Sequence, residues 1–496
     1  MPAMSEAFAY TKEEGTVSDI DRPDTLDPRD DLVGGLVSGQ MSRDEFVKRA
    51  GLLGLSVTAI GGMLVAAGKA TAADERAARG LAGGTVNLLI PAEGADKGVR
   101  DKLGEIKKRF GLNVNVTALA VGPLIQKLDQ SVKAPTGTYD AISVLGFTVA
   151  QFVGGGYFTN LTPYVKKLPA GYGYPSDFAK GELDYLSYFN IAKQQFGGST
   201  PYLIPGLYAG PIILFYRKDL LRKAGISVPT NWAQYLAAAR KLNGNGIAGN
   251  TMIAKSGDVS MFLVDWYTRF ASQGGKLMSG SPQAKNFTPR LNSPQGVAAL
   301  EHMVECVKYS TPGVLSYDFT ISTDAFSAGK TAMMLMWSTI AGPVYNSKTS
   351  KVAKQVGVAV CPGVGSLRGT IVRGGWGMGI PKNAKNKDGA WTLITYLCSR
   401  EWGKFEVAAH QTDPARNSVF NDPALNRRFP YLRVAGQANQ KARILEIANI
   451  PETFELITIA AQQFAAALGG SSSAKDACQK ANDEWVKVLK RGGHLA

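Results

Sequence analysis

Residue types that could carry out chemistry are sparse in this chain of 496 residues. Its cysteines are Cys306, Cys361, Cys398 and Cys478, and its histidines are His302, His410 and His494. No two cysteines form a CxxC pair, so a zinc site with His and Cys ligands is not expected. With only three histidines, far apart in sequence, a catalytic triad of the Ser-His-Asp type is also not favoured. We expect no metal, no cofactor and no catalytic residue.

The stretch "RGGWGMGIPKNAKN", residues 373–386, sets a large aromatic ring among glycines. Glycine in a strand usually marks a bend or a close approach to the backbone. Tryptophan offers a flat apolar face with one polar atom. Trp376 could therefore contact a ligand where the bare backbone leaves room, and the alternative is that it packs in the core.

The elements that must position such residues are predicted by the hydrophobic pattern. Short apolar runs at 85–92, 113–120 and 139–145 are typical of strands, and residues 96–110 and 123–132 have helical spacing. Strands that alternate with helices predict a parallel sheet, and ligands bind beyond the carboxyl ends of such strands. A helix with Asn231 as its N-cap is also predicted, as are one helix at 389–402 and two helices after about residue 451.

The net charge of +15 could favour nucleic acid or anionic ligands. However, the basic residues are spread along the chain without a Lys/Arg block, so a dispersed soluble surface is the better interpretation and no nucleic-acid partner is expected.

The N-terminal part of the chain resembles an export signal preceded by an extension. Residues 1–40 are expected to be a disordered extension, although "DDLVGGLVSGQ" within them is typical of a short helix. Residues 41–72 carry a charged start, an apolar run from Gly51 to Gly68 and an A-x-A site at 70–72, which indicates an export signal. The segment resembles a twin-arginine signal, with Asp44 in place of the second arginine, and general secretion is the alternative. An uncleaved anchor and a start at Met41 also stay open.

Five further motifs occur in order: "YDAISVLGFTVAQFVGGGYFTNLTPYV", "YAGPIILFYRKDLLRKAGISVPTNW", "FSAGKTAMMLMWS", "GGWGMGIPKNAKNKDGAWTLITYL" and "PARNSVF". Together they resemble extracellular solute-binding protein family 1, the maltose-binding-like receptors of ABC importers, from about Val86 to about Leu489. The resemblance implies a two-lobed α/β fold of the type II periplasmic-binding-protein class. Each lobe would hold a mostly parallel sheet flanked by helices. The N-terminal lobe would be 84–212 with 375–406, and the C-terminal lobe 213–374 with 407–496.

In such a fold the chain would cross between lobes near 211–216 and 373–375, and the glycines would allow hinge dihedrals. The resemblance implies a ligand site in the cleft made of Glu93, Phe147, Thr148, Tyr208, Gly210, Asp265, Trp266, Trp337, Arg373, Gly375, Trp376 and Arg416. Trp266 could equally belong to the core, and Arg416 could simply anchor its own loop.

The implied function is an exported, periplasmic or envelope-associated monomer that captures a carbohydrate and delivers it to ABC permease subunits. One alternative is an anionic sugar derivative, which Arg373 and Arg416 could bind; another is a polyamine. An exported glycan-processing enzyme is a further alternative, for which Glu93 and Asp265 are the only evident carboxylate pair.

Overall fold

The computed structural model describes residues 28–53, 55, 60, 63–64, 69, 83–92 and 94–496. The chain divides into two compact units, Met1–Leu81 and Ala82–Ala496, and each is described by itself. The predicted cleavage site at 70–72 lies outside the described residues, as do residues 1–27 of the expected disordered extension. None of the described helices is long and apolar enough to cross a membrane.

The N-terminal unit contains the helices α1 (Pro28–Val37) and α2 (Arg43–Leu52). The short helix predicted just before the signal is therefore present, inside the segment expected to be disordered. Ser42 caps α2, because its side chain accepts a hydrogen bond from the Glu45 backbone N–H at 3.3 Å. A small apolar cluster, which includes Leu36, Phe46 and Leu64, holds the unit together.

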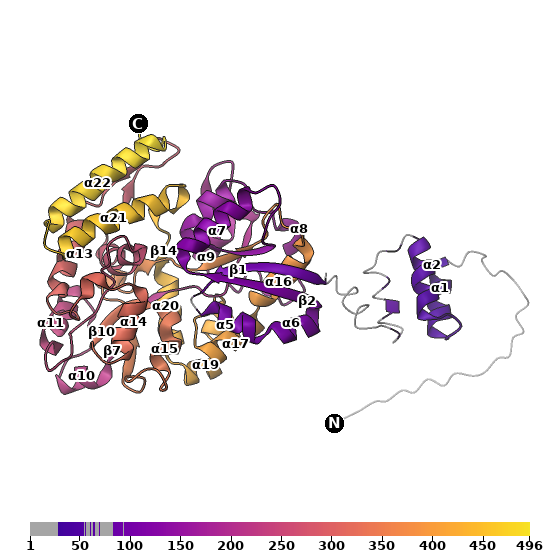
Figure 1. Cartoon of the computed structure of the whole chain (residues 1–496), viewed down its shortest axis with the longest axis horizontal. Coiled ribbons are helices and arrows are strands. Elements are labelled where there is room, and N and C mark those ends of the chain that lie inside the picture. Colours follow the sequence, from indigo (N-terminus) through magenta and orange to yellow (C-terminus); the bar gives the residue numbers. More distant parts are fainter. Residues whose placement is uncertain are drawn as a thin grey trace, which may run out of the picture. The chain divides into compact units, whose positions relative to one another are not determined.

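The second unit is built on two sheets (Figure 1). The first sheet has the strand order β2-β1-β3-β13-β6. Its strands are β1 (Gly84–Pro91), β2 (Leu112–Leu119), β3 (Ala141–Leu145), β6 (Leu203–Gly206) and β13 (Trp376–Gly379). The helices around it are α5 (Ala95–Asp101), α6 (Leu103–Phe110), α7 (Val121–Lys133), α8 (Thr162–Val165), α9 (Lys180–Leu186), α16 (Lys387–Leu397) and α17 (Arg400–His410). We call these elements the first-sheet region.

The second sheet has the order β10-β7-β11, made of β7 (Ile212–Arg217), β10 (Met333–Trp337) and β11 (Val356–Ala359). Its helices are α10 (Lys218–Lys223), α11 (Trp232–Leu242), the π-helical η3 (Met261–Tyr267), α12 (Thr268–Ala271), α13 (Pro294–Val307), α14 (Phe319–Ser327), α15 (Ala341–Tyr345), α18 (Asn417–Phe420), α19 (Pro423–Arg428), α20 (Tyr431–Lys441), α21 (Thr453–Leu468) and α22 (Ala474–Arg491). We call these elements the second-sheet region.

Short elements complete the fold. They are the 3₁₀ turns η1 (Gly146–Thr148), η4 (Val314–Ser316), η5 (Ser338–Ile340), η6 (Gly365–Leu367) and η7 (Glu446–Asn449), the π-turn η2 (Ala150–Gly154), and the two-stranded pairs β4 (Tyr188–Asn190) with β5 (Gln195–Pro201), β8 (Met278–Ser279) with β9 (Thr288–Pro289), and β12 (Ile371–Val372) with β14 (Ala442–Arg443).

The predicted elements agree with the structure in kind, and two predicted helices are divided. The helical pattern at 96–110 is split at Lys102 into α5 and α6. The strands predicted at 85–92, 113–120 and 139–145 are β1, β2 and β3, and they pair in parallel as expected. The Asn231 side chain caps α11 by accepting from the Gln234 backbone N–H at 2.9 Å. The single helix predicted at 389–402 is instead two helices. Ser399 interrupts it because its hydroxyl caps the new helix α17 at the Trp402 N–H.

Each sheet contains one strand that runs against its neighbours. In the first sheet this is β13, which is antiparallel to both β3 and β6. In the second sheet it is β7, which is antiparallel to both β10 and β11. Each reversed strand directly follows a segment that leads out of the other sheet, so the reversal follows from chain crossings between the two regions. The fold is thus of the predicted α/β class, but the expectation of a mostly parallel sheet in each lobe is wrong: the first sheet is mixed, and both strand pairings of the second sheet are antiparallel.

All four cysteines are buried and free. Among the described residues, no group of three or more His, Cys, Asp or Glu side chains could hold a metal ion.

Candidate functional site

Two crossing segments lie against each other between the sheets. A Cβ atom on Gly374 would come within 2.7 Å of the Gly210 carbonyl oxygen, which a real side chain cannot do without moving the backbone. Gly210 and Gly375 have φ angles of 63° and 104°, in the left-handed region that favours glycine. The glycines of "RGGWG" are therefore explained by close backbone packing at the crossing.

Asp413 anchors this crossing from a third segment, just after α17. Its Oδ2 atom accepts a hydrogen bond from the Gly210 backbone N–H at 2.6 Å. The side chain is fully buried, and burial raises the pKa of Asp413 to about 7 against the lowering effect of that hydrogen bond.

A cavity opens beside the crossings, and its atom-free space, open mouth included, is about 790 Å³. Both sheets contribute the carboxyl end of a strand, through Leu145 of β3 and Trp337 of β10. The full lining is Val121, Leu145, Gly146, Phe147, Tyr185, Tyr208, Gly210, Val259, Ser260, Leu263, Phe319, Trp337, Thr339, Val372, Arg373, Gly374, Gly375, Trp376 and Leu445.

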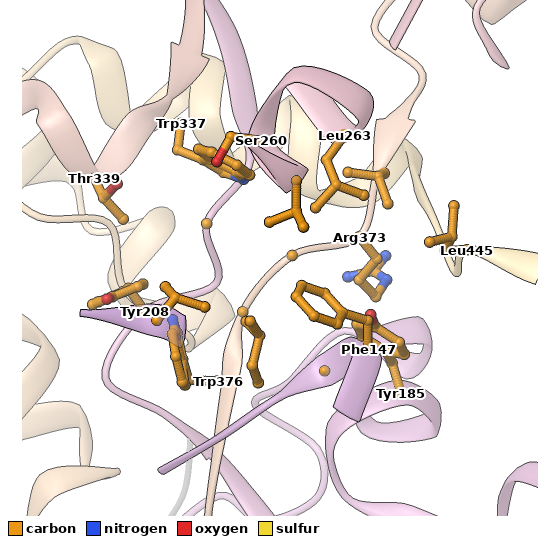
Figure 2. A pocket seen from close by; sticks show the side chains of 18 of the residues that line it. Phe147, Tyr185, Tyr208, Ser260, Leu263, Trp337, Thr339, Arg373, Trp376 and Leu445 are labelled. Carbon is orange, nitrogen blue, oxygen red and sulfur yellow. The ribbon is translucent and has the colours of Figure 1, made fainter. Parts of the chain in front are cut away.

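Aromatic rings dominate the lining (Figure 2). Trp376 and Tyr208 lie on one side of the cavity and Phe147 with Tyr185 on another, while Trp337 faces them from the second-sheet region. Trp337 is half-buried and its ring centroid lies 6.1 Å from that of Phe319. Such flat apolar faces suit the apolar face of a sugar ring or an extended carbon chain.

Polar side chains in the lining are few. They are the hydroxyl groups of Tyr185, Tyr208, Ser260 and Thr339, the indole N–H groups of Trp337 and Trp376, and the guanidinium of Arg373. The lining residues that the structure describes include no carboxylate and no carboxamide. The cavity can therefore orient a solute through hydroxyls, indole N–H groups and one cation, with most of its contact area apolar.

Arg373 is 4% exposed and connects parts of the second unit that are far apart in sequence. Its Nη1 donates to the Asn439 side-chain oxygen at 3.2 Å, and its Nη2 donates to the backbone oxygens of Asn439 and Ala442, both at 3.0 Å. The guanidinium also packs against Gly181 of α9, where an added Cβ would lie 3.0 Å from Nη2.

Seven of the residues expected in the ligand site line this cavity: Phe147, Tyr208, Gly210, Trp337, Arg373, Gly375 and Trp376. Thr148 is buried next to it, and its hydroxyl donates to the Leu145 carbonyl at 2.8 Å. Glu93 lies outside the described residues.

Asp265, Trp266 and Arg416 lie outside the lining and have structural partners. Asp265 pairs with Arg269 at 3.0 Å. Trp266 is fully buried, stacks on Phe270 at 4.6 Å and donates its indole N–H to the Gly296 carbonyl. We therefore leave Asp265 and Trp266 out of the candidate site.

Arg416 anchors its own loop, as its alternative interpretation expected. It donates to the backbone oxygens of Cys398 and Tyr172, both at 2.7 Å, and pairs with Asp177 at 3.1 Å. Two of these partners, Tyr172 and Asp177, lie between α8 and α9, and the third, Cys398, directly follows α16. None of them lines the cavity, so we leave Arg416 out as well.

Sequence reasoning missed several lining residues, among them Tyr185, Ser260, Leu263, Phe319 and Thr339. Two signals were available. Thr339 follows the expected Trp337 by two residues, and Ser260 and Leu263 precede the expected Trp266 on the same buried segment. No sequence pattern pointed to Tyr185 of α9 or Phe319 of α14, because tertiary packing alone brings these two helices to the cavity.

Comparison with known proteins gives a match to a family. The model for bacterial extracellular solute-binding proteins matches residues 93–404. A protein of Sinorhizobium fredii, named "Probable amino-acid ABC transporter periplasmic-binding protein", is 27% identical over 63% of this chain and 70% of its own length. The mannitol-binding protein of Pseudomonas aeruginosa is 25% identical over 75% of this chain and 85% of its own length.

Solved structures show the same fold. An ABC transporter solute-binding protein of Agrobacterium radiobacter K84, crystallised with ribitol, superposes with a TM-score of 0.72 at 26% identity, covering 82% of this chain and 99% of that one. A solute-binding protein of Agrobacterium vitis S4 with bound D-mannitol has a TM-score of 0.70 at 22% identity, with 83% and 99% covered.

Proposed function

Because this chain belongs to the family of bacterial extracellular solute-binding proteins, we propose that it captures a sugar or a sugar alcohol in the cavity at the crossings and delivers it to an ABC permease. The observation that carries this proposal is the place of the cavity: residues of both sheet regions and of both glycine crossings line it. A solute bound there touches both regions at once, so its binding can favour one arrangement of the two over another.

The relatives support the ligand class. The Pseudomonas relative is named for mannitol, and the Agrobacterium radiobacter structure holds ribitol. The aromatic lining supports it too, because rings and carbon chains of polyols pack on flat apolar faces. A polyamine would need several carboxylates around it, and the described part of the lining contains none.

We propose that the site consists of the expected residues that line the cavity, with Trp337, Trp376 and Phe147 as the apolar platform. Gly210 and Gly375 let the two crossings bend as hinges between an N-terminal lobe, 84–212 with 375–406, and a C-terminal lobe, 213–374 with 407–496. Closing of these lobes around the solute would be the signal that the permease reads.

No chemical step is part of this proposal. Hydrolysis of a glycoside needs two carboxylates held at a defined separation across the bond. Asp265, one of the two candidates, is paired with Arg269 away from the cavity. We further propose that the apolar N-terminal segment directs export, so that the mature receptor acts outside the inner membrane as a monomer.

The test is a thermal-shift screen of the purified mature chain with sugars and sugar alcohols, followed by calorimetry on each hit. We expect a dissociation constant of order 1 μM, about −8 kcal/mol. A ligand at about a hundred times its dissociation constant then adds roughly 2.7 kcal/mol of stability. Conversion of any hit to a product would refute the receptor function, as would a panel in which no solute binds.

A further inference from the structure

Arg373 is a buried cation without an ion-pair partner among the residues that the structure describes. It forms none of the ion pairs found among the described residues, and the three hydrogen bonds of its Nη groups go to neutral oxygens. Its Nε–H has no hydrogen-bond partner in the described part of the chain. A buried charge of this kind is costly unless something of opposite charge approaches it.

Glu182 and Asp184 are carboxyl groups near this guanidinium, and neither forms an ion pair with it; Asp184 pairs with Lys180 instead. The Glu182 side chain is 1% exposed, and the Asn439 side chain, which also accepts from Arg373, acts on it to lower its pKa. Burial raises the pKa of Glu182 to about 8, although the charge of Arg373 acts in the lowering direction. Arg373 thus has no carboxylate within ion-pair distance among the described residues, and its Nε–H stays unpartnered there.

The remaining lining cannot balance the charge either. Arg373 is the charged residue among the described lining residues, and the others are aromatic, aliphatic, hydroxyl-bearing or glycine. A neutral polyol would leave the buried cation as it is. A solute with a carboxylate would supply the missing charge and accept the unpaired N–H in a charge-assisted hydrogen bond.

We propose that the solute of this site is an acid of the sugar or polyol class, with its carboxylate on Arg373 and its carbon chain or ring against Trp337 and Phe147. This inference rests on the proposed function and narrows its ligand class. The carboxylate accepts a hydrogen bond from the charged Arg373 side chain. A CH₂OH group in the same place would accept a weaker hydrogen bond, because it is neutral. Arg373 then determines specificity within the cavity.

Matched solutes that differ in a single group test this without any mutation. The pairs are D-mannonate with D-mannitol, D-gluconate with D-glucitol, and D-ribonate with ribitol. Titration calorimetry on the wild-type chain at pH 7 should show the aldonate of at least one pair binding ten-fold or more tightly than its alditol. An alditol that binds as tightly as its aldonate in every pair that binds would overturn the inference.

Variants locate the preference. Arg373→Gln should bring the aldonate-to-alditol affinity ratio to about one, whereas Arg373→Lys should keep the aldonate ahead. Arg416→Gln is the matched control, because it also removes a buried guanidinium but lies outside the cavity, and it should keep the wild-type ratio. If Arg373→Gln keeps the full preference, the carboxylate is not bound by this residue and the proposal fails.

The failure of the inference differs from the failure of the proposed function. If alditols bind and aldonates do not, the proposed receptor function stands and the proposal of an acidic solute is refuted. A complete absence of binding across aldonates, alditols and sugars would overturn both. Should the Arg373 variants not fold, the wild-type ratio alone decides.

Discussion

Arg269 in the second-sheet region and Arg373 at the crossings are both almost completely buried, yet of the two only Arg269 forms an ion pair with a carboxylate of the described part of the chain. Arg269 pairs with Asp265 at 3.0 Å, donates to His302 at 3.0 Å and lies over the Trp232 ring at 5.1 Å. The hydrogen bonds of the Arg373 side chain go only to amide and carbonyl oxygens. The difference separates an arginine that completes a core from one that faces a cavity.

Arg416 supports this interpretation as a third case. It is 2% exposed, pairs with Asp177 at 3.1 Å and lies between the rings of Tyr172 and Phe178. The two buried arginines outside the cavity thus each have an aspartate. A buried pair is stable only when both charges and their hydrogen bonds are complete. A buried arginine that lacks its carboxylate partner and lies beside a cavity is therefore a place where a negatively charged ligand group is expected.

The largest effect should come from breaking the complete pair. Asp265→Asn removes the charge opposite Arg269 and leaves a buried cation uncompensated, which costs about 3–5 kcal/mol of unfolding free energy. Denaturant unfolding measures this loss, while affinity for the solute should stay unchanged in the folded fraction.

Asp318→Asn is the matched control for that variant. Asp318 pairs with Lys255 at 3.3 Å on the surface, and Asn can still cap α14. Exposed pairs of this kind contribute about 0–1 kcal/mol. Equal losses in the two variants would contradict the distinction between buried and exposed pairs made here.

A smaller effect, on binding, should come from the aromatic platform. Trp337→Ala removes a half-buried ring at the cavity, so we expect affinity for the solute to fall ten-fold to a hundred-fold, about 1.4–2.8 kcal/mol. Calorimetry against the best-binding solute of the screen measures this loss.

Trp391→Ala on α16 is its control. Trp391 is also half-buried but packs on Tyr164 at 5.3 Å, outside the cavity lining, and its loss should leave affinity at the wild-type level. Wild-type affinity in Trp337→Ala would place the ligand elsewhere.

A further effect, on the pH dependence of stability, concerns a buried carboxyl group that has no arginine. Glu406 is 3% exposed, and burial, with Asp101 as a further contribution, raises the pKa of its side chain to about 8 from its usual 4.5. The folded chain therefore holds this proton between about pH 4.5 and pH 8 while the unfolded chain has lost it. This contribution to stability is present in full below that window and is lost as the pH rises through it, by about 1.4 kcal/mol per pH unit.

Glu406→Gln should remove that decline, because the amide does not titrate. Denaturant unfolding of both proteins at several pH values between 5 and 8 measures the two slopes. A variant with the same slope as the wild type would show that Glu406 is ionised in the folded chain.

The sequence predicted much of this fold because its strongest signals are local. The apolar runs of β1, β2 and β3 and the Asn231 cap of α11 lie within single elements, and their periodicity survives in the structure. The boundary between α16 and α17 was missed because it depends on one side-chain hydrogen bond. The Ser399 hydroxyl accepts from the Trp402 backbone N–H and so begins a new helix, and the apolar pattern does not record that bond.

The site was less predictable. Residues 261–267 form a segment that is buried on all sides, so its pattern contains no period that separates a cavity-facing side from a core-facing side. Leu263 faces the cavity and Trp266 the core because of what packs around η3. The sequence does not contain that information locally.

By itself the sequence determined the α/β class, the order of the motifs and the glycine-rich crossing, because these depend on spacing and on backbone freedom along the chain. The tertiary structure decided which arginine faces a cavity. Asp265 lies four residues before Arg269, and Asp177 is far from Arg416 in sequence, yet both are within 3.1 Å of their partners. Ion pairing and burial depend on distances in space, and it is those distances that left Arg373 without a carboxylate partner.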